Sequence, residues 1–513
     1  MIHGHRAEES TMNTLSILRV ILRRACLPIL GFICVICLSA APAQEAAKVT
    51  VHWDKTTVIS NSTPTLQVVV NPPLRPGEPL GIAAYKALKE LGADYVRYVP
   101  WLPYPRLGVA ELEPPTPEKT SWDFGLIDPM VKDFLAATDG HPTVMNFSTM
   151  PAWLFKTVKP VTYPDDPIKP VWNYTQGTEE RDPTDKEIGD YYARLVSWYV
   201  DGGFTDENGV RHVSGYHYKF PVWEVLNEPE SEHKTTPEQY TRRYDAIVSA
   251  IHKVSPETKF IGLALGWANQ EPQYFEYFLD PKNHKPGIPI DYISYHFYVV
   301  PEPAERVTEW QYTFFNKADG FLNTVRYAEA IRKRLSPATK VDLDELGAIL
   351  LTDNHPGDDV PPPAEYWNLC GSLYAYLYIE LSRMRIDLIG MSQLVGYPTQ
   401  YPSVSMMDWT KNQPNARYWV LKLIEESFHA GDKLVQTSIQ TRDLEAQGFV
   451  TEGGRKLLLA NKRNHAVDVD LPDAEKASAL TVDAETGDGP ARSVKPAGGK
   501  IRLEPFAVTV VSW

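Results

Sequence analysis

Short apolar runs alternate with amphipathic stretches from residue 65 to about residue 431. The apolar runs have the length of buried strands, and the amphipathic stretches carry apolar residues at helical spacing. Strands that alternate with helices in this way are typical of parallel βα units, and eight such units predict a (β/α)8 TIM barrel. The runs that we expect to be its strands are 66–70, 93–99, 143–147, 221–226, 260–265, 291–298, 341–345 and 388–396.

Two of the expected helices begin with a capping-box pattern. Thr184 is followed three residues later by Glu187, and Thr236 is followed three residues later by Gln239. In this pattern the hydroxyl caps the first turn, and the longer side chain reaches back to the capping residue. Pro237 also occupies a position that suits the first turn of a helix. We therefore expect helices to begin at both sites.

The pattern changes near residue 431. Between 434 and 511, short runs with apolar residues at every second position are separated by Gly, Asp, Asn and Pro. This predicts a small antiparallel β-sandwich over 432–513, in which we interpret 487–499 as a polar loop. We expect the segment 44–64, which contains an apolar run at 49–53, to add a strand to the sandwich, and 65–431 to form the barrel.

The first 43 residues differ from the rest of the chain. Three arginines precede an almost continuous apolar run at 26–40, and the small residues 41–43 follow it. This arrangement predicts a secretory signal peptide, and hence a secreted or periplasmic protein with no membrane attachment after cleavage. The alternative is a membrane anchor, but the run is short compared with the ~20 residues that a spanning helix needs.

Composition narrows the classes of function. Three of the four cysteines lie in the predicted signal peptide, and Cys370 lies in an apolar stretch, so neither a disulfide nor a cysteine nucleophile is expected. The formal net charge of −14 disfavours nucleic acid as a partner. No phosphate loop or dinucleotide fingerprint is present, so no cofactor is predicted. The acidic loop at 353–359 is interpreted as a solvated turn, and no metal site is predicted.

Two glutamates end predicted strands. The run 221–226 leads directly into Asn227-Glu228-Pro229, where the proline prevents the strand from continuing. Glu345 ends the seventh run, three βα units later along the chain. Barrel enzymes place their catalytic groups at the carboxyl ends of strands, so the two carboxylates are expected to face one another across the barrel mouth.

A pair of carboxylates is what glycoside hydrolysis requires. One carboxyl group protonates the leaving oxygen, and the other, ionised, attacks the sugar or activates water. Acidic residues at strand ends are also often only solvated or paired with arginine. Asp342, Asp344, Glu224 and Glu230 are candidates for such a structural role, and the pair is a more specific signal than either glutamate alone.

Five stretches carry a resemblance to a known family. Residues 223–229 resemble the acid/base strand of the clan A retaining glycoside hydrolases, and 344–347 resemble their nucleophile strand. Residues 294–298 resemble the sixth strand, and 147–154 resemble the end of the third. Together with Trp122-Asp123-Phe124 and the terminal sandwich, the chain most resembles glycoside hydrolase family 39, which includes β-xylosidases and α-L-iduronidases.

The resemblance implies a role for individual residues. Glu228 would be the general acid/base, Glu345 the nucleophile, and Asn227 the partner of the sugar 2-hydroxyl. His296 or Tyr298 would orient Glu345, although both could instead be core residues. Asp344 stands where the family has Thr or an apolar residue, which leaves open which carboxylate attacks.

Further residues are assigned to the sugar site on the same basis. Arg97 would keep the nucleophile charged, or could instead form a structural bridge to Asp94. Aromatic rings can stack on sugar faces or pack in the core, and the candidates are Trp101, Trp153, Trp267 and Tyr397.

The expected function is that of a secreted retaining glycosidase, most like a β-xylosidase, acting on oligosaccharides or polysaccharides of cell walls or exopolysaccharide. The alternatives are another clan A activity (β-glucosidase, arabinosidase, iduronidase or endo-acting), a carbohydrate-binding protein without catalysis, and an interaction scaffold. The sequence leaves open which sugar is cleaved and whether the protein forms a homo-oligomer.

Overall fold

The computed structural model describes residues 46–172, 178–353, 361–471 and 473–513. The predicted signal peptide, residues 1–43, lies outside these ranges. In the described part of the chain, no helix is both long enough and apolar enough to cross a membrane.

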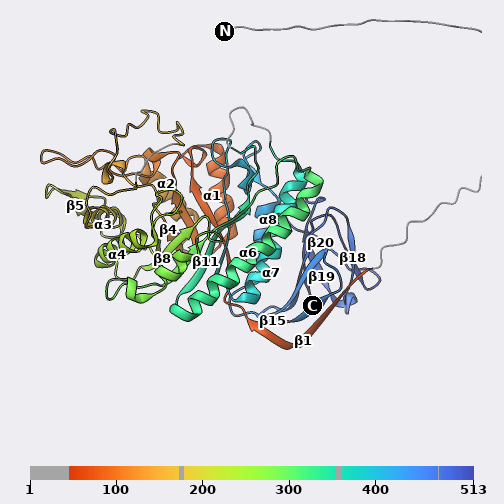
Figure 1. Ribbon diagram of the computed structural model, residues 1–513. Helices are drawn as coiled ribbons and strands as arrows, with labels where there is room; N and C mark the ends of the chain where they lie inside the picture. Colours follow the sequence, from red (N-terminus) through yellow and green to blue (C-terminus); the bar gives the residue numbers. More distant parts are fainter. Residues whose placement is uncertain (1–45, 173–177, 354–360, 472) are drawn as a thin grey trace, which may run out of the picture. The chain divides into compact units, whose positions relative to one another are not determined.

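A closed parallel barrel forms the larger part of the fold, as predicted (Figure 1). Each strand pairs in parallel with its neighbours, and the last strand pairs with the first, which closes the barrel. The sixth predicted strand is split at His296 into two segments that both pair with the seventh. The strands are β2 (Thr63–Val70), β3 (Val96–Pro100), β4 (Thr143–Met145), β7 (Val222–Glu224), β8 (Lys259–Leu265), β9 (Tyr292–Tyr295), β10 (Phe297–Val299), β11 (Lys340–Ala348) and β12 (Leu388–Met391).

Helices cover the outside of the barrel (Figure 1). They are α1 (Pro79–Leu91), α2 (Ile127–Ala137), α3 (Lys186–Val200), α4 (Pro237–Val254), α5 (Pro272–Phe278), α6 (Val307–Leu335), α7 (Ala364–Met384) and α8 (Ala416–Glu425). Two small antiparallel pairs are formed by β5 (Gly203–Thr205) with β6 (Arg211–Val213), and by β13 (Met407–Asp408) with β14 (Gln413–Pro414). Short 3-10 turns are η1 (Pro72–Leu74), η2 (Pro105–Leu107), η3 (Ala152–Leu154), η4 (Pro281–Asn283), η5 (Pro402–Val404) and η6 (Ala474–Lys476).

One of the two predicted capping boxes is present. The Thr236 hydroxyl accepts a hydrogen bond from the Gln239 N–H at 3.2 Å, and the Gln239 side chain accepts one from the Thr236 N–H at 2.9 Å. The box predicted at Thr184 was wrong. Asp182 accepts the Glu187 N–H at 3.0 Å and also holds the Thr184 hydroxyl, because a carboxylate two residues earlier competes for the same donors.

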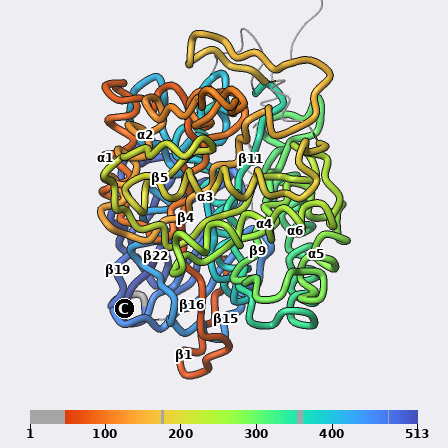
Figure 2. The backbone as a smooth tube through the Cα atoms, turned by 90° about the vertical axis from the view of Figure 1, so that its left-hand side faces the viewer, coloured from red at the N-terminus to blue at the C-terminus, as the bar shows by residue number. Residues whose placement is uncertain are grey.

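The C-terminal sheet contains nine strands in the order β20-β19-β22-β17-β16-β15-β1-β18-β21. β1 (Ala47–Ile59) pairs antiparallel with β15 and parallel with β18, so the segment before the barrel belongs to this sheet (Figures 1 and 2). The remaining strands are β15 (Lys433–Ile439), β16 (Leu444–Thr451), β17 (Gly454–Asn461), β18 (Val467–Asp470), β19 (Ser478–Val482), β20 (Arg492–Val494), β21 (Lys500–Leu503) and β22 (Val508–Ser512).

The interpretation of 487–499 as a loop was wrong in part, because β20 lies within it and pairs with β19. Three residues are too few to show an alternating pattern, and the surrounding Gly and Pro dominate the sequence signal.

The sheet domain packs against α7 of the barrel. The Ser372 hydroxyl donates to the Asn461 carbonyl at 2.7 Å, and Arg383 donates to the Gln447 side chain at 2.8 Å. One apolar cluster runs from the barrel core to Phe449 and Leu458 of the sheet. Cys370, on the same helix, is buried in this cluster.

Candidate active site

A cavity of about 280 Å³ lies at the carboxyl ends of the barrel strands. Six of the residues predicted for the sugar site line it: Glu228, Glu345, Asn227, Tyr298, Trp101 and Trp267. This face of the barrel is where the βα loops meet and where barrel enzymes carry their active sites.

The backbone that carries Glu228 is held in a strained conformation. Leu226 and Glu228 have φ angles of 65° and 39°, in the left-handed region that ordinary residues seldom adopt. The Glu228 N–H donates to the Ala264 carbonyl at 2.9 Å. A Cβ atom at Gly266 would lie 2.6 Å from the Glu228 carboxyl carbon, so only glycine leaves room for this carboxylate.

Glu345 is held by two donors. Its Oε1 accepts from Arg97 Nη1 at 2.5 Å, and its Oε2 accepts from the Tyr298 hydroxyl at 2.6 Å. The β11–β12 register shifts by one residue between Leu343 and Leu346, which is the geometry of a β-bulge. The bulge lets Asp344 and Glu345, although consecutive, both contact Arg97.

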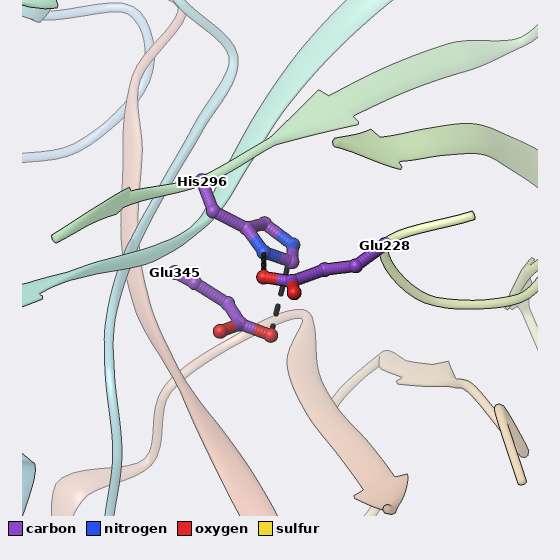
Figure 3. A group of neighbouring side chains, drawn as sticks. All are labelled: Glu228, His296 and Glu345. Atoms are coloured by element: carbon purple, nitrogen blue, oxygen red, sulfur yellow. Dashed lines mark hydrogen bonds and ion pairs between the residues drawn. The ribbon is translucent and has the colours of Figure 1, made fainter. Parts of the chain in front are cut away.

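The two glutamates point toward one another, with His296 beside them (Figure 3). One carboxylate oxygen of each glutamate and one ring nitrogen of His296 all lie within 4.8 Å of one another. Retaining glycosidases hold their carboxyl groups about 5–5.5 Å apart, whereas inverting enzymes need roughly 6.5–9.5 Å to admit a water molecule. The spacing here therefore fits direct attack by a carboxylate.

His296 contacts Glu228 more closely than Glu345. Its Nδ1 lies 2.9 Å from Glu228 Oε1, and its Nε2 lies 3.6 Å from both Glu345 Oε1 and Asp344 Oδ1. Burial would lower the pKa of His296, but the carboxylates of Glu345 and Asp344 outweigh it and raise the pKa well above its usual value. Tyr298 is thus the residue that orients Glu345, and His296 supplies a positive charge between the two glutamates.

Glu228, His296 and Glu345 have the spacing of a metal site, but the charges around them do not favour a cation. Glu345 already forms an ion pair with the buried guanidinium of Arg97, and the raised pKa of His296 keeps its ring protonated. A metal ion would have to displace one positive charge and lie close to another.

Arg97 lies at the centre of the buried polar network. Besides Glu345, its guanidinium contacts Glu224 at 2.5 Å, Asp344 at 2.9 Å and the side-chain oxygens of Gln67 and Asn227, both at 2.7 Å. It is 1% exposed. The bridge from Arg97 to Asp94 considered above was wrong, because Asp94 instead contacts His141.

Asn227 is fixed from both ends of its carboxamide. Its oxygen accepts from Arg97, and its Nδ2 donates to Glu232 Oε1 at 2.8 Å. The Trp101 indole N–H donates to the same oxygen of Glu232. Burial, and then the charge of Glu228, raise the pKa of Glu232 well above its usual value. A rigid carboxamide that still has one free N–H can serve as a donor to a sugar hydroxyl.

The acids behind the cavity differ in charge state. Burial raises the pKa of Glu224 to about 7, although Arg97 acts in the opposite direction. Burial also raises the pKa of Asp342 well above its usual value, with the charge of Asp344 adding to the effect. Asp344 is also buried, but Arg97 and His296 lower its pKa, so it is the ionised partner of the guanidinium. Asp344 does not line the cavity, whereas Glu345 does.

These shifts predict that the protein loses stability as the pH rises. A buried acid whose pKa is raised holds its proton in the folded state at pH values where the unfolded chain has released it, so stability falls through that window. For Glu224, with its pKa raised to about 7, the loss between pH 5 and pH 8 is about 3 kcal/mol, and Glu111 and Glu180, both raised to about 8, act in the same direction. Urea unfolding at pH 5, 6, 7 and 8 measures the trend. A free energy of unfolding that is constant or increases over this range would contradict it.

The predicted aromatic residues divide into two groups. Trp101 and Trp267 line the cavity. Trp267 is 54% exposed, and its backbone N–H donates to Glu230 Oε1 at 2.8 Å. Trp153 and Tyr397 do not line it, contrary to expectation. The Trp153 indole N–H donates to the Glu111 carbonyl, and the Arg181 guanidinium lies 4.6 Å from its ring, so the ring is occupied by protein contacts.

Several residues of the site were not predicted. Tyr401 stacks on Trp101 at 5.7 Å, and Trp172 packs edge-on against both rings. Gln67 and Ser392 form a hydrogen-bonded group with the Tyr298 hydroxyl. Gln67 lies in the first predicted strand, 66–70. A polar residue in this otherwise apolar run is the signal from which the sequence could have indicated a site residue. Ser392 lies in the predicted eighth strand, 388–396, but the observed strand β12 ends one residue before it, at Met391. Tyr401 lies in a loop whose course the sequence does not indicate.

Two family models match the chain. The model of glycosyl hydrolases family 39 matches residues 38–331, more than half of the 513 residues. This range includes Glu228 and ends before Glu345. The model of the D-apionate lactonase C-terminal immunoglobulin-like domain matches residues 442–511, within the C-terminal sheet. No curated protein matches the chain.

Solved structures with the same fold include several glycosidases. A glycoside hydrolase family 51 arabinofuranosidase from Xanthomonas axonopodis pv. citri has a TM-score of 0.60 and 13% identity, covering 91% of this chain and 99% of its own. A family 30 endoxylanase from Clostridium papyrosolvens has a TM-score of 0.54 and 12% identity, covering 90% and 99%. The family 51 α-L-arabinofuranosidase from Thermotoga petrophila has a TM-score of 0.57 and 16% identity, covering 91% and 100%. At these identities the likeness establishes the fold.

Proposed function

Because this chain belongs to family 39 of the glycosyl hydrolases and is a retaining glycosidase, we propose that Glu228 and Glu345 perform a double displacement on a neutral, xylose-like sugar at a chain end. The observation that carries this proposal is the pair of facing carboxylates in the cavity, with oxygens within 4.8 Å of one another. Arg97 and Tyr298 hold one of the pair, and His296 and Ser231 hold the other.

In the first step, a carboxylate oxygen of Glu345 attacks the anomeric carbon, and the bond from this carbon to the leaving oxygen breaks. Glu228 gives its proton to that oxygen, so the leaving group departs as an alcohol. In the second step, Glu228 takes a proton from water, the water oxygen bonds to the anomeric carbon, and Glu345 leaves as a carboxylate. Two inversions give net retention.

Asn227 is placed to stabilise the transition state. Its remaining N–H can donate to the sugar 2-hydroxyl, and this contact strengthens as positive charge develops at the anomeric carbon. Trp267, exposed at the rim beside Gly266 and Glu228, is placed to stack on the leaving group.

The size and charge of the cavity support a neutral sugar at a chain end as the substrate. A volume of about 280 Å³ is near the lower limit of ~300 Å³ for ligand pockets, which favours a terminal sugar over the interior of a long chain. Among the residues that the structure describes, no Lys or Arg lines the cavity, so an iduronide carboxylate would find no ion-pair partner. We propose export through the segment 1–43, and cell-wall or exopolysaccharide glycans as substrates.

The proposal is tested with the mature protein and a panel of aryl glycosides (β-xyloside, β-glucoside, β-galactoside, α-L-arabinoside and α-L-iduronide). We expect release from the β-xyloside, with the retained anomer as the first product seen by NMR. In Glu228→Ala, substrates with a good leaving group should still form the intermediate, and azide should then give a glycosyl azide of retained configuration. First release of the inverted anomer would overturn the mechanism. Binding of these sugars without turnover, unaffected by Glu228→Ala, would favour a non-catalytic carbohydrate-binding protein.

A further inference from the structure

Five branched aliphatic side chains line the cavity. Three of them are buried and two are half-buried. Val69 and Val99 lie at the ends of β2 and β3, and Val300 and Ile349 follow β10 and β11. Val404 ends η5, where its carbonyl accepts the Gln393 N–H at 2.9 Å. We call these residues, Val69, Val99, Val300, Ile349 and Val404, the aliphatic wall.

Three polar side chains beside the wall form hydrogen bonds within the protein. Gln67 donates to Tyr298 and Ser392 and accepts from Arg97, and the Gln393 amide donates to the Gln400 carbonyl at 3.3 Å. The Tyr298 hydroxyl donates to Glu345. A sugar hydroxyl that contacts only the five aliphatic side chains would lose its hydrogen bonds to water without gaining a partner.

The catalytic geometry places the wall against the sugar and not against the leaving group. The anomeric carbon must lie at the two carboxylates, and the leaving group must lie on the side of Glu228, where Gly266 and Trp267 follow β8. The aliphatic wall comes from strands on both sides of β11 and from the segment after β12. It therefore surrounds the nucleophile, on the side where the remainder of the sugar ring has to lie.

We propose that the aliphatic wall selects sugars that carry no oxygen at C6, and that 6-deoxyhexosides are substrates of this enzyme besides pentosides. This inference rests on the proposed function and deepens it. A methyl group at C5 removes apolar surface from water on contact with the wall, which favours binding. A hydroxymethyl group buries an unpaired hydroxyl there, and a carboxylate buries an unpaired charge in a cavity that already contains two glutamates.

The test compares aryl glycosides that differ only in the 6-oxygen. The pairs are 4-nitrophenyl 6-deoxy-β-D-glucoside with the β-D-glucoside, and 4-nitrophenyl β-D-fucoside with the β-D-galactoside. In the pair that is hydrolysed faster, we expect kcat/KM to be about 10- to 100-fold higher for the 6-deoxy member than for the 6-hydroxy member. Equal values, or a preference for the 6-hydroxyl member, would overturn the inference and leave the proposed function intact.

A binding measurement separates this inference from catalysis. Calorimetry with 1-deoxynojirimycin and with its 6-deoxy analogue requires no turnover. Tighter binding of the 6-deoxy analogue supports the wall as a selector even if no glycoside is hydrolysed, in which case only the proposed function fails. Binding of neither compound, together with no release from either pair, would overturn the inference, and the proposed function would fail as well only if the β-xyloside were not hydrolysed either.

Isosteric variants test the wall itself. Val300→Thr and Val99→Thr keep the shape of the side chain and add one hydroxyl, which can serve as a partner for the 6-hydroxyl. At least one of them should reduce the ratio of 6-deoxy to 6-hydroxy kcat/KM about fivefold. Val200→Thr, at a half-buried position of α3 outside the cavity, is the matched control and should leave the ratio unchanged. An unchanged ratio in both wall variants would contradict the inference.

Discussion

Replacing Glu345 by alanine is expected to lower kcat by about 10⁴-fold or more while the protein remains folded and still binds the sugar. The substitution removes the atom that forms the covalent bond, and no other carboxylate among the described residues lines the cavity on that side. Added azide should enter the vacated space and attack the anomeric carbon directly. Since this is a single displacement, the product should be a glycosyl azide of inverted configuration.

Asp344 provides the matched control for that experiment. It is the neighbouring residue, it is ionised, and it contacts the same guanidinium, but it does not line the cavity. Asp344→Ala should reduce stability and activity without giving any inverted azide product. If azide instead restored turnover in Asp344→Ala and not in Glu345→Ala, the attacking carboxylate would be Asp344.

Replacing Arg97 by methionine is expected to lower the free energy of unfolding by about 3–5 kcal/mol, because it leaves buried carboxylates without their cation. Glu224, Asp344 and Glu345 all contact this guanidinium. Asn227 and Glu345 also lose the donor that positions them, so kcat should fall together with stability. Urea unfolding and aryl glycoside hydrolysis, measured on the same preparations, test both effects.

Two further variants separate charge from geometry. Arg97→Lys keeps the positive charge but cannot reach five acceptors with a single ammonium, so it should recover part of the stability and little of the activity. Arg181→Met removes an arginine whose ion pair with Glu187 is about one-third exposed, and it should cost no more than about 1 kcal/mol. If Arg97→Met were as stable as the parent, the central role assigned to this residue would be wrong.

The barrel could be predicted because each strand is an apolar run that ends at a turn, and this information is local. The run 221–226 and the Asn-Glu-Pro that follows it predict a strand end near Glu228. The strand β7 ends four residues earlier, at Glu224, but the face on which Glu228 lies still follows from the fold. The same reasoning placed Glu345 on the same face. The capping box at Thr236 is also local, and the structure contains it.

Contacts between distant segments could not be predicted in the same way. Arg97 had an acidic neighbour in the sequence, Asp94, but in the folded chain its partners come from β7 and β11. Trp153 and Trp101 look equivalent as aromatic residues after strands, but only the ring of Trp101 lines the cavity.

The aliphatic wall shows the same limit. Its five members come from five separate segments, and in the sequence each one has the features of an ordinary core residue. Their common position depends on the closure of the barrel and on the loop after β12. The register shift between Leu343 and Leu346 is another feature that the strand pattern does not indicate. Regular alternation predicts opposite directions for the adjacent acids Asp344 and Glu345, but both contact Arg97.

The most direct test of the double displacement is to trap its intermediate. The protein is incubated with the 2-deoxy-2-fluoro aryl derivative of its preferred sugar, in which the fluorine slows the second step, and the product is examined by intact mass and peptide mapping. We predict a gain of one fluoroglycosyl unit, carried as an ester on Glu345. A label on Asp344 or Glu228, or no label while the aryl alcohol is released with inversion, would contradict the mechanism.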